Sequence, residues 1–174
     1  MELIKAKTIA QRYVDKLRPY CDKIMIAGSI RREKAWVKDI EIVCIPKRFC
    51  PESKNLFQEV IKEPERPLKE FCDIINSLEA VKGNPAGKYT QRILPEGIKL
   101  DLFMADKNNF GLIAMIRTGS ADYSHDMMVI IDKKGFKSDG GQLINKDTGE
   151  IIPVPTEKDF YKITGIKFIK PKER

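Results

Sequence analysis

The chain of 174 residues carries a formal net charge of +7, and 42% of its residues are hydrophobic. That length allows one good core, or two small lobes sharing one, without disulfide support. No apolar run approaches membrane-spanning length and the N-terminus lacks the layout of a signal peptide, so we expect a soluble cytosolic protein. Four cysteines without Cys-x-x-Cys spacing and a single histidine exclude an ordinary zinc site.

The first segments predict one helix followed by two strands. Apolar residues recur at helical spacing up to Leu17, and Pro19 ends that helix. The stretches "KIMIAG" (23–28) and "DIEIVCI" (39–45) are typical of short buried strands, and "SIRREKAWV" between them suits a short helix. Trp36 on that helix is interpreted as a packing residue.

The middle of the chain predicts an insertion and then a hairpin. Residues 46–88 are loop-rich, with helices predicted over Asn55–Ile61 and Pro67–Ser77 on either side of "KEPERP". Strands follow at 88–94 ("KYTQRIL") and 98–104 ("IKLDLFM"), joined by "PEG" in a tight connection.

The last third has a different pattern of predicted elements, which indicates a second lobe. Helices at 109–117 and 121–133 flank "RTGS", and Gly-rich short strands precede a last helix near 156–162. We therefore expect an α+β protein with a first domain over 1–108 and a small lobe over 109–174.

Three acids stand inside the predicted strands. Residues i and i+2 of a strand share a face, so Asp39 and Glu41 point together while Ile40 and Ile42 fill the other side. Asp101 lies in a second apolar strand, "KLDLF". An exposed strand face is the simple alternative, but three acids on two strands favour a metal site. Oxygen ligands suit Mg²⁺ or Mn²⁺, and two such ions can organise a displacement at phosphorus.

A Gly-Ser turn precedes the acids. Gly28 and Ser29 close a strand and open a helix, where backbone N–H groups and a hydroxyl can hold a phosphate. Arg31 or Arg32 would add charge-assisted hydrogen bonds. Taken singly these signals are weak, and their order and spacing carry the argument.

This order resembles the nucleotidyltransferase superfamily: a hydrophobic residue, Gly-Ser, nine residues, then Asp-Ile-Glu-Ile. More narrowly, "GSIRRE" and "KLDLF" resemble the turn and the third-carboxylate strand of family X DNA polymerases, the DNA polymerase beta type. "RTGS", "PVPTEKDFYKITG" and "PKER" resemble their C-terminal lobe in order and spacing.

The resemblance implies a nucleotidyltransferase palm with a mixed β-sheet and flanking helices, followed by a small α+β lobe that closes on the nucleotide. It implies template-directed addition of deoxynucleotides to a DNA 3′-hydroxyl by two-metal phosphoryl transfer, in short-gap repair. The implied partners are gapped or primed DNA, dNTP and two Mg²⁺ ions, with Mn²⁺ as the alternative. We expect a monomer, without a membrane, in the cytoplasm, the nucleoid or a viral particle.

The resemblance also implies roles for individual residues. Asp39 and Glu41 would bridge the two metal ions, and Asp101 would bind the catalytic one and activate the primer hydroxyl. Two further sets follow: Gly28, Ser29, Arg32, Thr118, Gly119, Ser120 and Asp122 for the nucleotide, and Lys99, Tyr123 and Ser124 for DNA.

The chain departs from the family pattern at several positions. The second acid is Glu41 where these polymerases usually carry Asp, and Glu33 stands where glycine is common. Ile116 and Arg117 replace an aromatic pair that screens the sugar. Residues 1–20 leave no room for the N-terminal lyase and helix-hairpin-helix modules, so the chain resembles the minimal polymerases that some viruses encode.

Two alternatives stay open at this point. The same palm supports nucleotide transfer to an RNA end, a small molecule or a protein. A non-catalytic DNA-binding module would carry the three acids only as solvated strand residues. The Thr-Gly-Ser turn together with "PVPTEKD" favours the polymerase over both.

Overall fold

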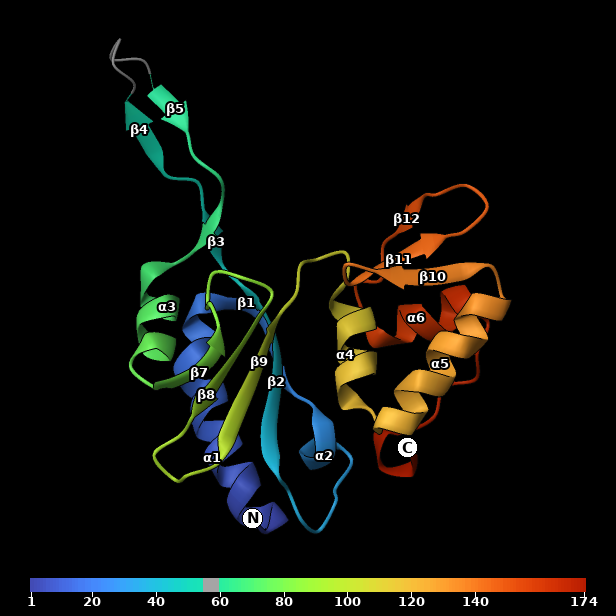
Figure 1. The fold of residues 1–174 in the computed structure, drawn as a ribbon, viewed down its shortest axis with the longest axis horizontal. Helices are drawn as coiled ribbons and strands as arrows, with labels where there is room; N and C mark the ends of the chain where they lie inside the picture. The colour runs from blue at the N-terminus through green and yellow to red at the C-terminus, as the bar shows by residue number, and fades with distance from the viewer. Residues whose placement is uncertain (55–59) are drawn as a thin grey trace.

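A five-stranded mixed sheet forms the centre of the first part of the chain (Figure 1). The structure is a computed structural model that describes residues 1–54 and 60–174. Neighbouring strands β2 and β9 run parallel, and the other pairs are antiparallel. The sheet order is β1 (Cys21–Ile26), β2 (Asp39–Pro46), β9 (Lys99–Met104), β8 (Tyr89–Ile93) and β7 (Glu79–Gly83).

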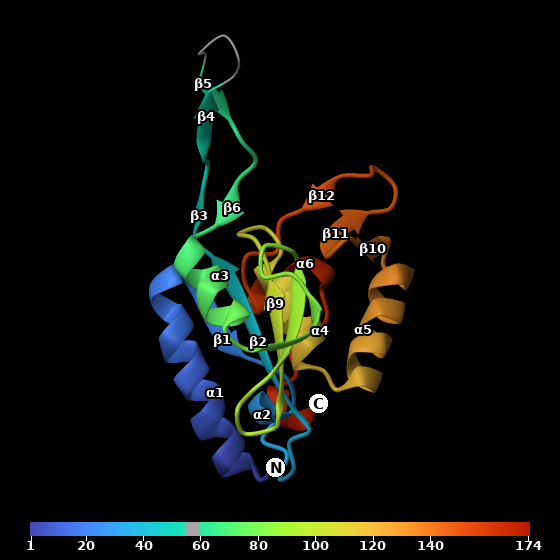
Figure 2. The same cartoon turned by 60° about the vertical axis from the view of Figure 1, so that its left-hand side comes forward.

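Helices cover the two faces of this sheet, as Figures 1 and 2 show. On one face, α1 (Leu3–Leu17) and α3 (Lys69–Asn76) enclose a core with the even-numbered apolar residues of β2 and β9. The other face meets α4 (Phe110–Thr118) through the odd-numbered residues of the same strands. Helix α1 buries residues three or four apart, as its periodicity predicts: Ala6, Ile9, Ala10, Tyr13, Val14 and Leu17.

A second core lies C-terminal to the sheet, beyond residue 111. Its helices are α4, α5 (Ala121–Lys133) and α6 (Glu157–Thr164), and α6 begins with a capping box between Thr156 and Asp159. A three-stranded antiparallel sheet lies against them, made of β10 (Phe136–Asp139), β11 (Gln142–Asn145) and β12 (Ile151–Ile152). The largest fully buried side chains of this core are those of Leu112, Met115, Ile131 and Phe160.

The insertion differs from its prediction. Most of the predicted helix 55–61 lies outside the described residues, and the two that are described, Val60 and Ile61, belong to a strand. A narrow ribbon extends from the sheet here (Figure 1). Its strands are β3 (Arg48–Phe49), β4 (Glu52–Lys54), β5 (Val60–Lys62) and β6 (Arg66–Pro67). The second predicted helix of the insertion is confirmed as α3.

Short segments complete the chain and correct two expectations. Helix α2 covers only Gly28–Arg31, because the backbone turns at Glu33, whose φ is +57°. Trp36 is 70% exposed, so its interpretation as a packing residue is wrong. Single 3₁₀ turns lie at Arg18–Tyr20 and Pro171–Glu173. In the described part of the chain, no helix combines the length and apolarity that crossing a membrane requires. The expected α+β class with a mixed sheet is confirmed.

Candidate active site

The three predicted acids lie on one face of the sheet, toward α4. In β2, Ile40 and Ile42 are fully buried against α1, so Asp39 and Glu41 project from the opposite face. Strand β9 pairs with β2 in parallel register, which sets Asp101 directly beside Glu41. The alternation in the sequence therefore predicts this grouping correctly, and the pairing of β2 with β9 completes it.

The grouped carboxylates disfavour one another's charge. Burial, and then the charges of Asp39 and Asp101, raise the pKa of Glu41 to about 7. Burial, followed by the charge of Asp101, also raises the pKa of Asp39. Arg32 and Arg117 act in the other direction on the pKa of Glu41 but do not cancel its rise. The site thus holds more negative charge than its own cations neutralise, which is the condition that a bound metal ion relieves.

The donor set fits Mg²⁺ or Mn²⁺ in its chemistry. All three groups offer oxygen, which hard divalent ions prefer. As the side chains are placed, no three His, Cys, Asp or Glu groups among the described residues converge closely enough to hold one ion. The Glu41 carboxylate lies against Gly28, and Asp101 accepts hydrogen bonds from Tyr89 and Gln91. A metal ion would therefore require the Glu41 side chain to turn toward Asp39 and Asp101.

The Gly-Ser turn lies beside the acids and offers unpaired polar groups. The backbone of Gly28 has a φ of +60°, and a Cβ there would stand 1.8 Å from Oε2 of Glu41, so only glycine fits. Within the described residues, Oγ of Ser29 and Nε of Arg32 are buried without a hydrogen-bond partner. Buried donors without a partner are costly, and a phosphate oxygen would satisfy both.

The two arginines after this turn reach the C-terminal lobe. Arg31 donates to Oγ1 of Thr118 at 2.6 Å and to Oε2 of Glu157 at 2.7 Å. Arg32 donates to the backbone carbonyl of Thr118. The sequence left open whether Arg31 or Arg32 serves a phosphate. The structure engages Arg31 with the lobe through both its terminal nitrogens, and leaves Nε of Arg32 available.

The three residues of the Thr-Gly-Ser turn make different contacts. Thr118 is fully buried, and its hydroxyl bonds to Ala114 as well as Arg31, so its side chain does not face a ligand. Gly119 has a φ of +65°, which favours glycine, and a Cβ there would stand 2.9 Å from Nη1 of Arg32. Ser120 caps α5 by accepting from the backbone of Tyr123.

The remaining predicted residues divide between surface and lobe interior. Asp122 and Lys99 are exposed, and Lys99 is the register partner of Asp39. The Tyr123 hydroxyl lies 2.8 Å from that of Tyr161, inside the lobe. Ser124 donates to the carbonyl of Ile116 at 2.8 Å. Both of these side chains make structural contacts, and their predicted DNA contacts remain predictions.

Tyr89 and Gln91 were not identified from the sequence, and Arg117 was named only as a replacement in the family's aromatic pair. Tyr89 and Gln91 on β8 both donate to Asp101, and the guanidinium of Arg117 lies 4.1 Å from the centre of the Phe103 ring. The hairpin connection "PEG" together with the alternation in "YTQRI" was a usable signal. An antiparallel hairpin brings alternate residues of one strand beside the acid of the other.

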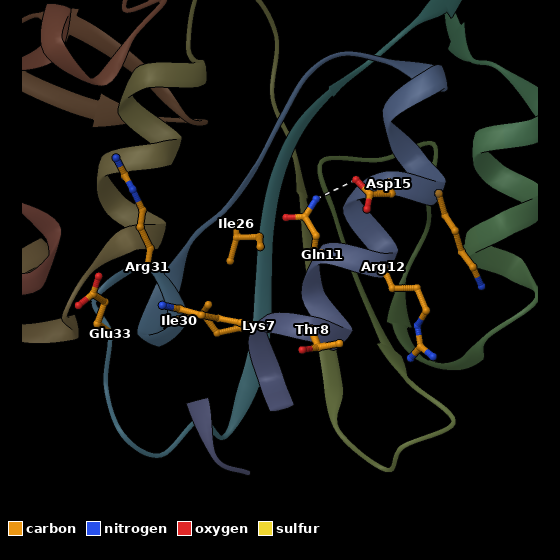
Figure 3. Close-up of a pocket in the computed structure, with 10 residues that line it drawn as sticks. Lys7, Thr8, Gln11, Arg12, Asp15, Ile26, Ile30, Arg31 and Glu33 are labelled. Atoms are coloured by element: carbon orange, nitrogen blue, oxygen red, sulfur yellow. Dashed lines mark hydrogen bonds between the residues drawn. The ribbon is translucent and has the colours of Figure 1, made fainter. Parts of the chain in front are cut away.

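One large groove lies away from the acids. It holds about 990 Å³ between α1, the edge strand β1 and α2, and Figure 3 shows its side chains. Its lining includes Lys7, Gln11 and Ile26, and none of the three carboxylates. A cavity of about 480 Å³ is closer to the chemistry, because Tyr89 and Arg117 line it. We therefore locate the candidate site by its charges and unpaired donors rather than by cavity size.

Comparison with known proteins shows similarity to DNA polymerases, including one match to the C-terminal segment. A family model described as DNA polymerase beta thumb matches residues 114–174, the segment that carries most of the second core. DNA polymerase lambda of Rattus norvegicus is 27% identical over 86 residues, which cover 44% of this chain and 15% of the rat protein. The chain thus spans a small part of that relative. With its mixed sheet, flanking helices and matched C-terminal segment, the chain is similar to family X polymerases, as its sequence motifs predict.

Proposed function

We propose that the protein is a DNA-directed DNA polymerase that adds deoxynucleotides to a DNA 3′-hydroxyl and fills short gaps during repair. The observation that carries the proposal is the grouping of Asp39, Glu41 and Asp101 on one sheet face, beside the segment matched by the polymerase beta thumb model. The partners in this proposal are gapped or primed DNA and dNTP.

Asp39, Glu41 and Asp101 would hold two Mg²⁺ ions, or Mn²⁺ in their place. Such ions supply charge neutralisation and a polarised, more acidic 3′-hydroxyl. The protein needs no covalent intermediate, because positioning and electrostatic stabilisation carry phosphoryl transfer. In the described residues the protein's hydrogen bonds to Asp101 go to Oδ1 alone, so Oδ2 would be available to receive the hydroxyl proton.

Binding of the triphosphate would rest on the Gly-Ser turn. Oγ of Ser29 and Nε of Arg32 are the buried donors in need of an acceptor, and both lie on α2 or its end. The positive field of Arg32 and Arg117 acts on the same site, as their effect on Glu41 indicates. A triphosphate seated here would place its α-phosphorus near the carboxylates. Arg117, which replaces an aromatic residue of the family, would lie near the sugar and influence its selection.

Extension of a labelled primer at a one-nucleotide gap tests the proposal. Each dNTP and rNTP is offered with Mg²⁺ or Mn²⁺ to the wild type and to Asp101→Ala, with Asp22→Ala on the exposed part of β1 as the matched control. We expect metal-dependent, template-directed addition that is lost only in Asp101→Ala. A folded wild type that binds dNTP but extends no primer with either metal would contradict the proposal and favour transfer to another acceptor.

A further inference from the structure

The third carboxylate is held by two side chains whose only described hydrogen bonds go to it. The Tyr89 hydroxyl donates to Oδ1 of Asp101 at 2.5 Å, and the Gln91 amide donates to the same oxygen at 2.8 Å. Resting on the proposed function, we infer that Tyr89 and Gln91 are positioning residues that orient Asp101 so that its Oδ2 faces the metal ion and the primer hydroxyl.

The strand register makes this arrangement a consequence of the fold. Gln91 is the antiparallel partner of Asp101, and Tyr89 is the partner of Phe103, two residues further along the same face. The Tyr89 ring stacks on Phe103 with centroids 5.0 Å apart and planes 26° apart. The phenol is therefore fixed by packing before it donates, so little side-chain freedom remains to be lost on forming the bond.

The opposite face of β8 shows what purely structural contacts on this strand look like. Thr90 and Arg92 are buried, and their side chains donate to backbone carbonyls, among them that of Lys82. Those bonds join the strand to its neighbours. Tyr89 and Gln91 instead direct both donors to one oxygen of one catalytic acid, and leave its second oxygen unbonded in the described structure.

Two hydrogen bonds to Oδ1 make the two carboxylate oxygens of Asp101 inequivalent. The terminal torsion of an aspartate is broad and its two oxygens are equivalent by rotation. Asp101 is 8% exposed, so water does little to fix it. Holding Oδ1 settles which oxygen turns to the ligand. Outer partners that orient a metal ligand in this way typically contribute about 10- to 100-fold to metal affinity or activity.

Mn²⁺ binding and single-gap kinetics together test the inference. Free Mn²⁺ is titrated by electron paramagnetic resonance against the wild type, Tyr89→Phe and Gln91→Leu. Tyr20→Phe, on a 3₁₀ turn outside the acid face, is the matched control. Tyr89→Phe keeps the ring and its stacking and removes only the donor. We expect Mn²⁺ affinity and kcat to fall about tenfold or more in both variants. The KM for dNTP should stay near wild type, because neither residue contacts the nucleotide-binding turn.

Unchanged Mn²⁺ affinity and kcat in both variants would overturn the inference. A lower Tm with unchanged Mn²⁺ affinity would also overturn it, because that result indicates a structural role alone. A wild type that binds no Mn²⁺ overturns it together with the metal assignment. A wild type that binds Mn²⁺ yet extends no primer overturns the proposed function instead, and the Mn²⁺ titration of the variants then decides this inference by itself.

Discussion

At the scale of single residues, the site contains carboxylates without enough neutralising positive charge and buried hydrogen-bond donors without an acceptor among the described residues. Glu41 is half-buried beside two other acids, with its pKa raised to about 7. Ser29 and Arg32 have buried donor atoms that no described group accepts from. Such features cost folding free energy and persist where a ligand supplies the missing charge or acceptor. The two deficits have opposite sign, as a site for a metal-bound triphosphate requires.

The charge of Glu41 predicts a pH-dependent stability. Between about pH 4.5 and 7 its carboxyl holds a proton in the folded state that it has lost in the unfolded state, so stability falls as the pH rises through this window. The full cost, about 3 kcal/mol as an upper figure, is reached above pH 7. Glu41→Gln should therefore raise the metal-free free energy of unfolding at pH 8 and change it little at pH 4.5.

Urea unfolding at the two pH values measures this effect, with Glu79→Gln on the exposed strand β7 as the control. Adding Mg²⁺ to the wild type at pH 8 should recover part of the same stability. Equal effects of Glu41→Gln at both pH values would show that the charge of Glu41 is not the source of the cost.

Substitution of Arg32 should weaken nucleotide binding. Hydrogen bonds from a charged donor contribute about 1.5–3 kcal/mol, so Arg32→Ala should weaken the binding of a non-hydrolysable dNTP analogue by about 10- to 100-fold. Isothermal titration calorimetry measures the affinity, and Arg18→Ala, which removes an exposed arginine, is the control. Unchanged affinity in Arg32→Ala would reject its role in holding the triphosphate.

At the scale of elements, the turn between β1 and α2 brings hydrogen-bond donors without a described partner close to the acids. Gly28 has positive φ, and its missing side chain makes room for the Glu41 carboxylate. Positive φ alone costs other residues about 1–2 kcal/mol. The turn therefore carries two separate requirements for glycine, one from the backbone and one from the neighbouring strand.

Gly28→Ala and Gly97→Ala separate these requirements. Gly97 has a φ of +74° with nothing within 4 Å of the added Cβ, so its substitution should cost only the backbone term. Gly28→Ala should cost about 1–3 kcal/mol more in the metal-free protein, since overpacking by the Glu41 side chain adds to the strain. Denaturant unfolding measures the loss of stability in both variants. Equal losses of stability would show that the contact with Glu41 is unimportant.

The elements themselves were predictable where burial imposes a period. The helices at both ends of the chain bury one face each, and the structure has them. The strands of "DIEIVCI" and "KLDLF" are short apolar runs that are buried almost throughout, and the structure has them as well. Strand β7 was missed because all five of its residues are exposed, which leaves no alternation to detect. The ribbon β3–β6 was missed for the same reason, since its described strands bury almost nothing. Local patterns do not give the register between β8 and β9. The contacts of Tyr89 and Gln91 with Asp101 therefore became evident only from the structure.

At the scale of the whole molecule, one carboxylate joins the Gly-Ser turn to the end of the chain. Glu157 at the start of α6 accepts from Arg31 at 2.7 Å and from Arg174 at 2.6 Å. The Arg174 side chain is fully buried, and its guanidinium also lies over the rings of Tyr123 and Tyr161. The position of the second core relative to the Gly-Ser turn thus depends on a buried ion pair.

Glu157→Gln should lower the free energy of unfolding by about 3 kcal/mol, because it leaves the buried Arg174 charge without a partner. It should also lower the affinity for the dNTP analogue less than Arg32→Ala does, since Glu157 acts on the turn through Arg31. Urea unfolding and calorimetry measure both effects, with Glu150→Gln at an exposed position as the control. A change within about 0.5 kcal/mol of that control would show that the ion pairs contribute no net stability.

In the function that we propose, the three carboxylates bind the metal ions that a nucleotide brings to the Gly-Ser turn. The most direct measurement is a crystal structure with one-nucleotide-gapped DNA, a non-hydrolysable dNTP and Mn²⁺, whose anomalous scattering locates the ions. We predict Mn²⁺ peaks at bonding distance from Asp39, Glu41 and Asp101, with the triphosphate against Ser29 and Arg32. Ordered nucleotide and DNA with Mn²⁺ bound elsewhere, or with the three carboxylates free of metal, would contradict the account.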